Sequence, residues 1–300
     1  MDAAIKHHFN QTIKERIQLT GGYTFSTWLL TLDDGQKVVF RFCRDFVTGG
    51  GRKIIISDIL EREKFFYDSV NKALGHICPK VYVTDGSCLH HDTAFQISEY
   101  LEGEPLDKCF DSLNGQQKNN VYLKFGEIAG KINKMQIDVK HPFILSRGPW
   151  EDFFAIRLRE RLTALIKNNL LTNDDINKII DNFQGRKAER VLSFLHIDLR
   201  FANLIYNDGH IYLLDAENCE FGDPLYELSV LKMNNYLTKH FLEGYSKFFG
   251  EIPDMDNELF YFYQMERCAL VADVFLNEVK DEALAKQYTE LFNRLKSILL

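Results

Sequence analysis

Apolar and polar positions along the first hundred residues predict strands around one helix. Residues 17–43 are rich in Thr, Trp, Leu and Val, and Asp34-Gly35 is a hairpin turn signal between TWLLTL and KVVFRF. Residues 52–75 change to apolar positions three and four apart, which indicates a helix that Gly75 ends. The segments KVYVTDGS and TAFQISEYLEG again read as strands. We therefore predict a mostly antiparallel sheet with one embedded helix.

The pattern changes to helices from Leu106 onward. NNVYLKFGEIAGKINKMQ, EDFFAIRLRERLTALIKNNL and DDINKIIDNF carry apolar residues at helical spacing, and so does most of the chain after residue 230. Residues 191–215 interrupt them with a second strand cluster, in which the turn NDG separates NLIY from HIYLLD. The sequence predicts an α+β protein with a small sheet-rich part followed by a larger helical part.

Composition narrows the class of protein. The 300 residues are 45% hydrophobic and carry a net charge of −7, which argues against a nucleic-acid partner because phosphate backbones favour clustered positive charge. The six cysteines show no metal-binding spacing and are expected to be reduced thiols of a cytoplasmic protein. The N-terminus shows no apolar leader, and no run of about 18 apolar residues predicts a membrane span.

Three polar side chains interrupt the second strand cluster. His196-Ile197-Asp198 is followed by Asn203, which gives the pattern HxDxxxxN, and Asp215 ends the strand after the hairpin. Phosphoryl transfer from a nucleotide needs one carboxylate to orient the attacking hydroxyl, and an amide and a second carboxylate to hold Mg²⁺. The HxDxxxxN pattern alone is a moderately specific signal of a phosphotransferase site. Together with the hairpin and Asp215 after it, the signal is strong.

A family resemblance rests on these residues and on the segment that continues to Ser229. HIDLRFANLIYNDGHIYLLDAENCEFGDPLYELS resembles the core of the aminoglycoside phosphotransferase/choline kinase superfamily, the small-molecule relatives of protein kinases. LTGGYTFSTWLL resembles its nucleotide loop, VVFR its phosphate-pairing strand, and FQISEYLEGEPL its hinge region. The resemblance covers roughly residues 17–230. It implies a two-lobed protein-kinase-like fold, with an N-terminal lobe over 1–100, a hinge near 98–103 and a C-terminal lobe over 104–300.

The resemblance assigns roles to individual residues. Asp198 is expected to be the catalytic base or hydroxyl-orienting group, and Asn203 and Asp215 the Mg²⁺ ligands, with ATP or GTP as co-substrate. The expected nucleotide-binding residues are Gly22, Thr24, Ser26, Arg41, Glu63, Ser98 and Tyr100. Glu61 competes with Glu63 for Arg41, but the two acids lie on different helix faces. His196 is expected to be structural, and His90-His91 an exposed loop pair.

Two positions depart from the family pattern. Ile197 stands where the family usually has Gly, which puts the shape of the catalytic loop in question. Arg41 stands where protein kinases and several antibiotic kinases have Lys, a change that keeps the charge and alters the geometry of the donors.

The acceptor is expected to be a small cationic molecule. An aminoglycoside antibiotic is the first candidate, which would make the protein a resistance enzyme, and choline, ethanolamine or another small metabolite is the alternative. The candidate substrate-binding acids are Glu217, Glu220, Glu266 and Asp273. The last two lie seven residues apart and share one helix face, either in a polar pocket or toward solvent. A catalytically inactive binding module with the kinase-like fold is the alternative in which the protein is not an enzyme. The oligomeric state stays open.

Overall fold

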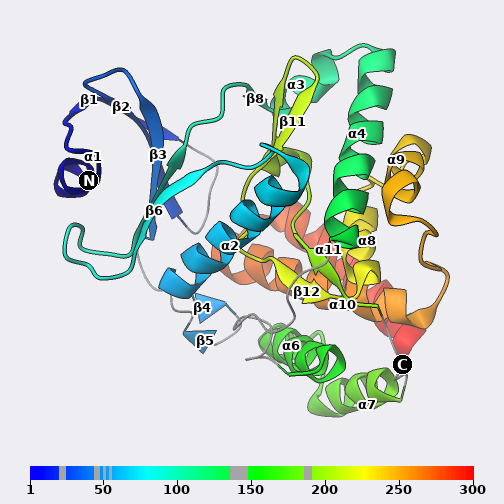
Figure 1. Cartoon of the computed structure of the whole chain (residues 1–300). Helices are drawn as coiled ribbons and strands as arrows, with labels where there is room; N and C mark the ends of the chain where they lie inside the picture. The colour runs from blue at the N-terminus through cyan, green and yellow to red at the C-terminus, as the bar shows by residue number, and fades with distance from the viewer. Residues whose placement is uncertain (20–24, 44–47, 50–51, 54–55, 136–147, 186–190) are drawn as a thin grey trace. The chain divides into compact units, whose positions relative to one another are not determined.

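The computed structural model describes residues 1–19, 25–43, 48–49, 52–53, 56–135, 148–185 and 191–300. By compactness the chain divides into two units (Figure 1). The first unit comprises residues 1–121 and 200–219, and the second comprises residues 122–199 and 220–300. The predicted hinge near residues 98–103 stays a prediction, because this division does not test where a hinge lies.

The first unit is built on a five-stranded antiparallel sheet with the strand order β1-β2-β3-β7-β6. These strands are β1 (Ile13–Leu19), β2 (Phe25–Leu32), β3 (Lys37–Cys43), β6 (Val81–Asp85) and β7 (Phe95–Glu99). The β2–β3 hairpin turns where the sequence predicts it, since Gly35 has a φ of 87°. β3 is the central strand, and it places Arg41 opposite Thr27 and Gln96.

Helices cover this sheet on two sides. Helix α1 (Asp2–Phe9) packs Ala4 and Ile5 against apolar side chains of β2, β3 and β7. Helix α2 (Ile56–Leu74) buries Leu60, Phe66 and Val70 and ends at Gly75, whose φ is 86°. The sequence predicted α2 but not α1. Phe40 belongs to this core cluster, and the partly buried Trp28 packs against it.

The second strand cluster contains the predicted hairpin. β10 (Leu204–Asn207) pairs with β11 (His210–Leu213), and Asp208 and Gly209 both have positive φ, which is the conformation of a two-residue hairpin turn. β10 also pairs with β8 (Glu104–Pro105) on its other side. The remaining short elements of this unit are β4 (Thr48–Gly49), β5 (Arg52–Lys53), α3 (Leu106–Cys109), η1 (Phe110–Ser112) and η3 (Phe201–Asn203).

Helices dominate the second unit. Helix α4 (Gly115–Lys134) begins in the first unit and continues into the second. The other helices that the structure describes here are α6 (Trp150–Ala164), η2 (Ile166–Asn168), α7 (Asn173–Gln184), α8 (Pro224–Met233), α9 (Lys239–Phe249), α10 (Glu258–Asp273), the π-helical η4 (Val274–Val279) and α11 (Glu282–Leu299). A two-stranded sheet joins β9 (Ser193–Leu195) to β12 (Glu220–Gly222). The sequence did not predict β12.

The core of this unit gathers aromatic rings around α6, α8 and α10. Trp150 donates a hydrogen bond from its indole nitrogen to the hydroxyl of Tyr263 at 3.0 Å, and its ring lies near those of Phe154 and Tyr226. A Cβ at Gly222 would lie 2.3 Å from the Trp150 ring, so only glycine lets β12 approach α6 this closely. The predicted α+β class, with an antiparallel N-terminal sheet and a helical C-terminal part, is confirmed.

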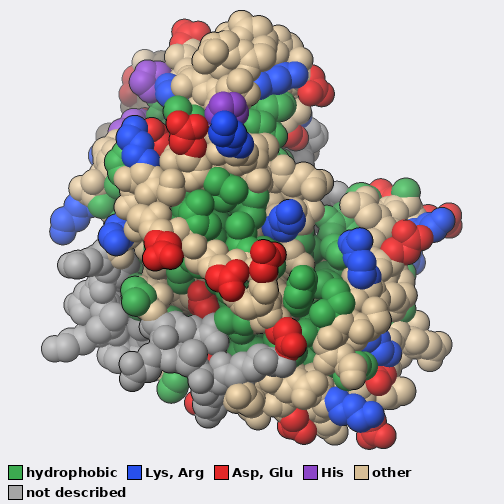
Figure 2. Space-filling view, turned by 90° about the vertical axis from the view of Figure 1, so that its right-hand side faces the viewer, with side chains coloured by type: hydrophobic (Ala, Val, Ile, Leu, Met, Phe, Trp, Pro, Cys, Tyr) green, Lys and Arg blue, Asp and Glu red, His purple; other side chains and the backbone are tan. Residues whose placement is uncertain are grey.

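Charged side chains of both signs are interspersed with hydrophobic ones on the face that Figure 2 draws. Among the described helices, none is both long enough and apolar enough to cross a membrane.

Candidate active site

The loop after β9 carries the predicted catalytic aspartate, Asp198, and the residue before it has a strained backbone conformation. Ile197 has a φ of 68°, a conformation that costs a β-branched residue about 1–2 kcal/mol. Its side chain is fully buried, and its N–H donates to Glu227 Oε1 at 2.7 Å. The N–H of Asp198 donates to Nδ1 of His196 at 3.3 Å, so His196 supports the loop. The strain of having isoleucine instead of glycine at position 197 is thus offset by burial of its side chain and by the hydrogen bond to Glu227.

Glu227 on α8 is the main support of this loop. Its carboxylate is fully buried and accepts hydrogen bonds from the backbone N–H groups of His196 at 2.8 Å and Ile197 at 2.7 Å. The Asn133 amide donates to Glu227 at 3.4 Å and to the carbonyl of Phe194 at 2.8 Å. Burial raises the pKa of Glu227. A buried acidic side chain of α8 therefore binds the backbone of the strained loop.

Asp198 forms an ion pair with Arg267 of α10. The Arg267 Nη2 donates to Asp198 Oδ1, and the two side chains are 12% and 10% exposed. Burial alone would lower the pKa of Arg267, but the Asp198 carboxylate raises it above the ordinary value. The same cation stabilises the ionised form of Asp198, which is the form that accepts a proton or a hydrogen bond.

Arg41 lies at the centre of an ionic network in the first unit. Its Nη1 donates to both Glu63 oxygens, at 2.8 and 2.7 Å, and its Nη2 lies 3.4 Å from Asp215 Oδ1. The Tyr67 hydroxyl donates to Glu63 at 2.9 Å and accepts from the Asp215 N–H at 2.7 Å. The structure therefore contains the ion pair expected between Arg41 and Glu63, while Glu61 is exposed. Burial works to lower the pKa of Arg41, but Glu63 and Asp215 outweigh it and raise the pKa.

A backbone hydrogen bond brings the chain at Asn203 close to the chain just before Asp215. The N–H of Leu214 donates to the carbonyl of Asn203 at 2.8 Å, so the two predicted ligands flank one backbone hydrogen bond. An amide oxygen and a carboxylate suit Mg²⁺, which usually completes its shell with water and substrate phosphates. Within the described residues, no group of three or more His, Cys, Asp or Glu side chains is arranged to hold a metal. The pair fits a metal shared with a nucleotide.

The predicted nucleotide loop is only partly described. Gly22 and Thr24 lie outside the described residues. Ser26 is buried in β2, where its hydroxyl accepts a hydrogen bond from the Trp28 indole at 3.3 Å. Ser98 is buried in β7, and Tyr100 follows that strand with Lys37 Nζ 5.3 Å from its ring. The nucleotide roles of these residues stay predictions.

The candidate acceptor-binding acids lie in different surroundings. Glu266 is fully buried and contacts Arg157 Nε at 2.6 Å, Arg161 Nε at 3.7 Å and the Tyr226 hydroxyl. Burial would raise the pKa of Glu266, but the two arginines lower it. The helix face that carries Glu266 therefore faces the protein interior at this position, where two arginines and a tyrosine hydroxyl surround the carboxylate.

Asp273 is also engaged within the protein. Its carboxylate accepts a hydrogen bond from Asn277 at 2.6 Å and lies 3.0 Å from Lys167 Nζ. Glu217 and Glu220 are partly exposed, one in each unit, and Glu220 Oε1 accepts from the N–H of Phe221 at 2.9 Å. Direct binding of a cationic substrate by any of the four acids stays a prediction, which the geometry of Glu266 does not support.

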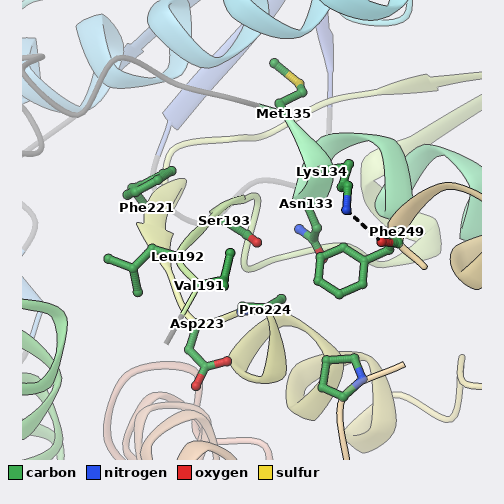
Figure 3. Close-up of a pocket in the computed structure, with 11 residues that line it drawn as sticks. Asn133, Lys134, Met135, Val191, Leu192, Ser193, Phe221, Asp223, Pro224 and Phe249 are labelled. Carbon is green, nitrogen blue, oxygen red and sulfur yellow. Dashed lines mark hydrogen bonds between the residues drawn. The ribbon is translucent and has the colours of Figure 1, made fainter. Parts of the chain in front are cut away.

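The second unit contains a cavity of about 780 Å³ (Figure 3). Its lining includes Lys134, whose Nζ donates to the Phe249 carbonyl at 3.2 Å, and Asp223, whose carboxylate caps α8 through the N–H of Leu225. None of the predicted site residues lines it.

Three residues with central contacts were missed from the sequence: Tyr67, Glu227 and Arg267. Tyr67 lies four residues after Glu63 on α2, so helical spacing could have paired them. Glu227 comes after the Gly-Asp-Pro segment and could have been noticed as an acid in an otherwise apolar helix. Nothing local indicates Arg267, which is 69 residues from Asp198.

Neither His90 nor His91 is exposed, in contrast to the expectation. The His90 ring stacks on His7 with centroids 3.9 Å apart, because α1 covers this end of the sheet. The ring of His91 packs against Phe42 with centroids 4.6 Å apart.

A known protein family covers these same residues. The model of the phosphotransferase enzyme family (APH) matches residues 15–261, and the chain belongs to this family. No curated protein matches the chain in sequence.

Solved structures share the fold across nearly the whole chain. The gentamicin complex of APH(2″)-IIa has a TM-score of 0.69 at 18% identity, covering 97% of this chain and 96% of that one. The ADP-bound aminoglycoside phosphotransferase APH(2″)-Ib has 0.67 at 17%, covering 100% and 99%. A protein from Thermobifida fusca described as a fructosamine-3-kinase has 0.69 at 13%, covering 100% and 98%. The likeness confirms the predicted protein-kinase-like fold.

Proposed function

We propose that this protein transfers the γ-phosphate of ATP or GTP to a hydroxyl group of a small molecule. The observation that carries the proposal is the network around Arg41, where one guanidinium meets carboxylates from α2 and from the end of the second hairpin. This network puts a fixed cation 3.4 Å from Asp215, the aspartate that we propose binds the metal. A triphosphate bound with Mg²⁺ needs both.

Four of the predicted residues act directly in this reaction. Asp198 accepts a hydrogen bond from the attacking hydroxyl and takes its proton as the bond to phosphorus forms. Arg41 pairs with the phosphates, and Asn203 and Asp215 supply the oxygen ligands for Mg²⁺. The metal, when bound, neutralises negative charge on the phosphates. Fold neighbours in complexes with GDP, ADP or ATP support a nucleotide co-substrate.

An aminoglycoside is the first acceptor to test, because neighbours of the same fold are described with gentamicin, kanamycin or streptomycin. Resistance to such antibiotics would then be the biological role. Choline, ethanolamine or another small metabolite is the alternative, and the neighbour described as a fructosamine-3-kinase supports keeping it. A cytoplasmic location follows from the nucleotide that the reaction consumes.

An inactive binding module of the same fold is the competing function. The sequence retains Asp198, Asn203 and Asp215, which favours the enzyme. The test is calorimetric binding of ATP and of GTP with Mg²⁺ to the wild type and to Asp215→Ala, together with nucleotide hydrolysis with and without an acceptor panel. The proposal predicts Mg²⁺-dependent binding that Asp215→Ala loses, and hydrolysis that an acceptor accelerates. Binding without any hydrolysis would instead support the module.

A further inference from the structure

Arg267 uses only part of its hydrogen-bonding capacity in the ion pair with Asp198. Only Nη2 has a partner, Asp198 Oδ1, among the residues that the structure describes. Neither Nε nor Nη1 is buried without a partner, so both retain access to solvent. A guanidinium has five N–H donors on a rigid plane, which match the oxygens of a carboxylate or a phosphoryl group. Arg267 therefore presents free donors directly beside the predicted catalytic aspartate.

The surroundings keep this guanidinium charged and in place. Arg267 follows Glu266 on α10, and Glu266 is already paired with Arg157 and Arg161. Three arginines thus contact two carboxylates in this cluster, Asp198 and Glu266, and a third carboxylate, Glu220, also acts electrostatically on Arg157. Arg157 Nη2 is buried and has no partner within the described chain, so donors also exceed acceptors. A cluster whose arginine donors outnumber their acceptors favours an anionic ligand.

The free donors of Arg267 lie beside Asp198, so we expect them to act while the phosphoryl group is transferred. Asp198 takes a proton from the acceptor hydroxyl while negative charge is carried by the oxygens of the phosphoryl group in transfer. Donors that are fixed before the reaction, and that point to where negative charge lies, lower the barrier most. An acceptor that carries a carboxylate or phosphate next to its hydroxyl would present the same chemistry to Arg267.

We propose that Arg267 is an oxyanion-binding residue of the transfer site. Its Nη2 holds Asp198, and one of its remaining donors, Nε or Nη1, binds an oxygen of the phosphoryl group in transfer or of an anionic substituent on the acceptor. The proposal rests on the proposed function and adds a catalytic cation to it. It contributes no proton and leaves the balance of the reaction unchanged: the phosphorus–oxygen bond to the nucleotide diphosphate breaks, the bond to the acceptor oxygen forms, and Asp198 takes the hydroxyl proton.

The test compares the wild type with Arg267→Met and Arg267→Lys. Arg159→Met serves as the control, because Arg159 is an exposed arginine whose Nη1 donates to the amide oxygen of Asn177 at 2.8 Å. Circular dichroism and the Tm without ligand establish that each variant is folded, and Arg267→Lys keeps the charge beside Asp198. The first probe is MgADP with aluminium fluoride, which imitates the phosphoryl group in transfer. The second is glucuronate against glucose, which differ in one carboxylate, in the presence of a non-hydrolysable Mg-nucleotide.

If the oxyanion is the phosphoryl group, Arg267→Met weakens binding of MgADP–aluminium fluoride about 10- to 100-fold and leaves binding of MgADP alone unchanged. If it belongs to the acceptor, the wild type prefers glucuronate over glucose and Arg267→Met abolishes the preference. Arg267→Lys is intermediate, since it keeps the charge but not the planar donors. Equal behaviour of wild type and Arg267→Met in both arms overturns the proposal. Failure of the wild type to bind MgADP overturns the phosphotransferase function itself.

Discussion

Replacing Glu227 with glutamine tests whether one buried carboxylate holds the catalytic loop. Glutamine keeps the shape of the side chain but offers one acceptor oxygen where Glu227 offers two, to the N–H groups of His196 and Ile197 at 2.8 and 2.7 Å. Its NH₂ group would face one of these donors and leave it unpaired in a fully buried position. Ile197, at a φ of 68°, would lose the contact that holds it there.

The expected loss combines two effects. A buried N–H without an acceptor costs about 1–3 kcal/mol, and exchanging a charge-assisted hydrogen bond for a neutral one costs about 1 kcal/mol more. We therefore expect Glu227→Gln to lose about 2–4 kcal/mol of unfolding free energy. For a large chain this lowers the Tm by about 2 °C per kcal/mol, or roughly 4–8 °C. Relaxation of Ile197 would displace Asp198 and reduce phosphoryl transfer about 10- to 100-fold, because a shift of about 1 Å in a reacting group has an effect of this order.

Differential scanning calorimetry and a coupled assay of nucleotide hydrolysis measure both quantities. Glu243→Gln is the matched control, since this glutamate of α9 is exposed and its carboxylate lies 3.7 Å from His240 Nδ1. The affinity for Mg-nucleotide should stay unchanged in both variants. A Tm of Glu227→Gln within 1 °C of the control, with an unchanged rate, would refute the role of Glu227.

Three further substitutions test other parts of the site and fold. Asp198→Asn should lower phosphoryl transfer by about 10²- to 10⁴-fold and leave Mg-nucleotide binding intact, as measured by steady-state rates and calorimetry; near-normal turnover would remove Asp198 from the mechanism. Tyr67→Phe leaves the N–H of Asp215 without its acceptor, so we expect a loss of about 1–3 kcal/mol in unfolding free energy and weaker Mg-nucleotide binding; equal affinity of variant and wild type would show that Tyr67 does not position Asp215. Asp175→Asn should cost about 1 kcal/mol at pH 7, because Asp175 completes the capping box of α7 and pairs with Lys296. The Asp175 pKa of about 2, set first by the Thr172 backbone N–H, lies below its unfolded value, so its contribution is present above about pH 4 and disappears as the pH falls toward 2. Denaturant unfolding across this range would contradict the assignment if the difference persisted at pH 2.

Local sequence features predicted the elements that hold the site. Asn207-Asp208-Gly209 predicted a hairpin because Asp and Gly tolerate positive φ, and both residues have it. Helical geometry separated Glu61 from Glu63, and the structure has Glu63 buried against Arg41. In each case the prediction depends on residues only a few positions apart in the sequence.

Contacts between distant segments could not be predicted in this way. Helix α10 is apolar on most of its surface, so its pattern did not reveal that Glu266 would meet two arginines of α6 or that Arg267 would meet Asp198. Helix α1 likewise covers part of His90 through a ring contact with His7, although His90-His91 reads locally as a polar loop. Such side-chain pairings depend on which segments pack together in the fold, and the pattern of a single segment does not predict that packing.

The central claim is that the chain moves a phosphoryl group from a nucleotide to a small-molecule hydroxyl. The most direct measurement incubates the wild type and Asp198→Asn with γ-³²P-labelled ATP or GTP, Mg²⁺ and a panel of aminoglycosides, amino alcohols and sugars, and traces the label chromatographically. The wild type should place the label on at least one acceptor in a Mg²⁺-dependent manner, and Asp198→Asn should not. Label that stays on the nucleotide, or leaves it only as inorganic phosphate with every acceptor, would contradict the claim.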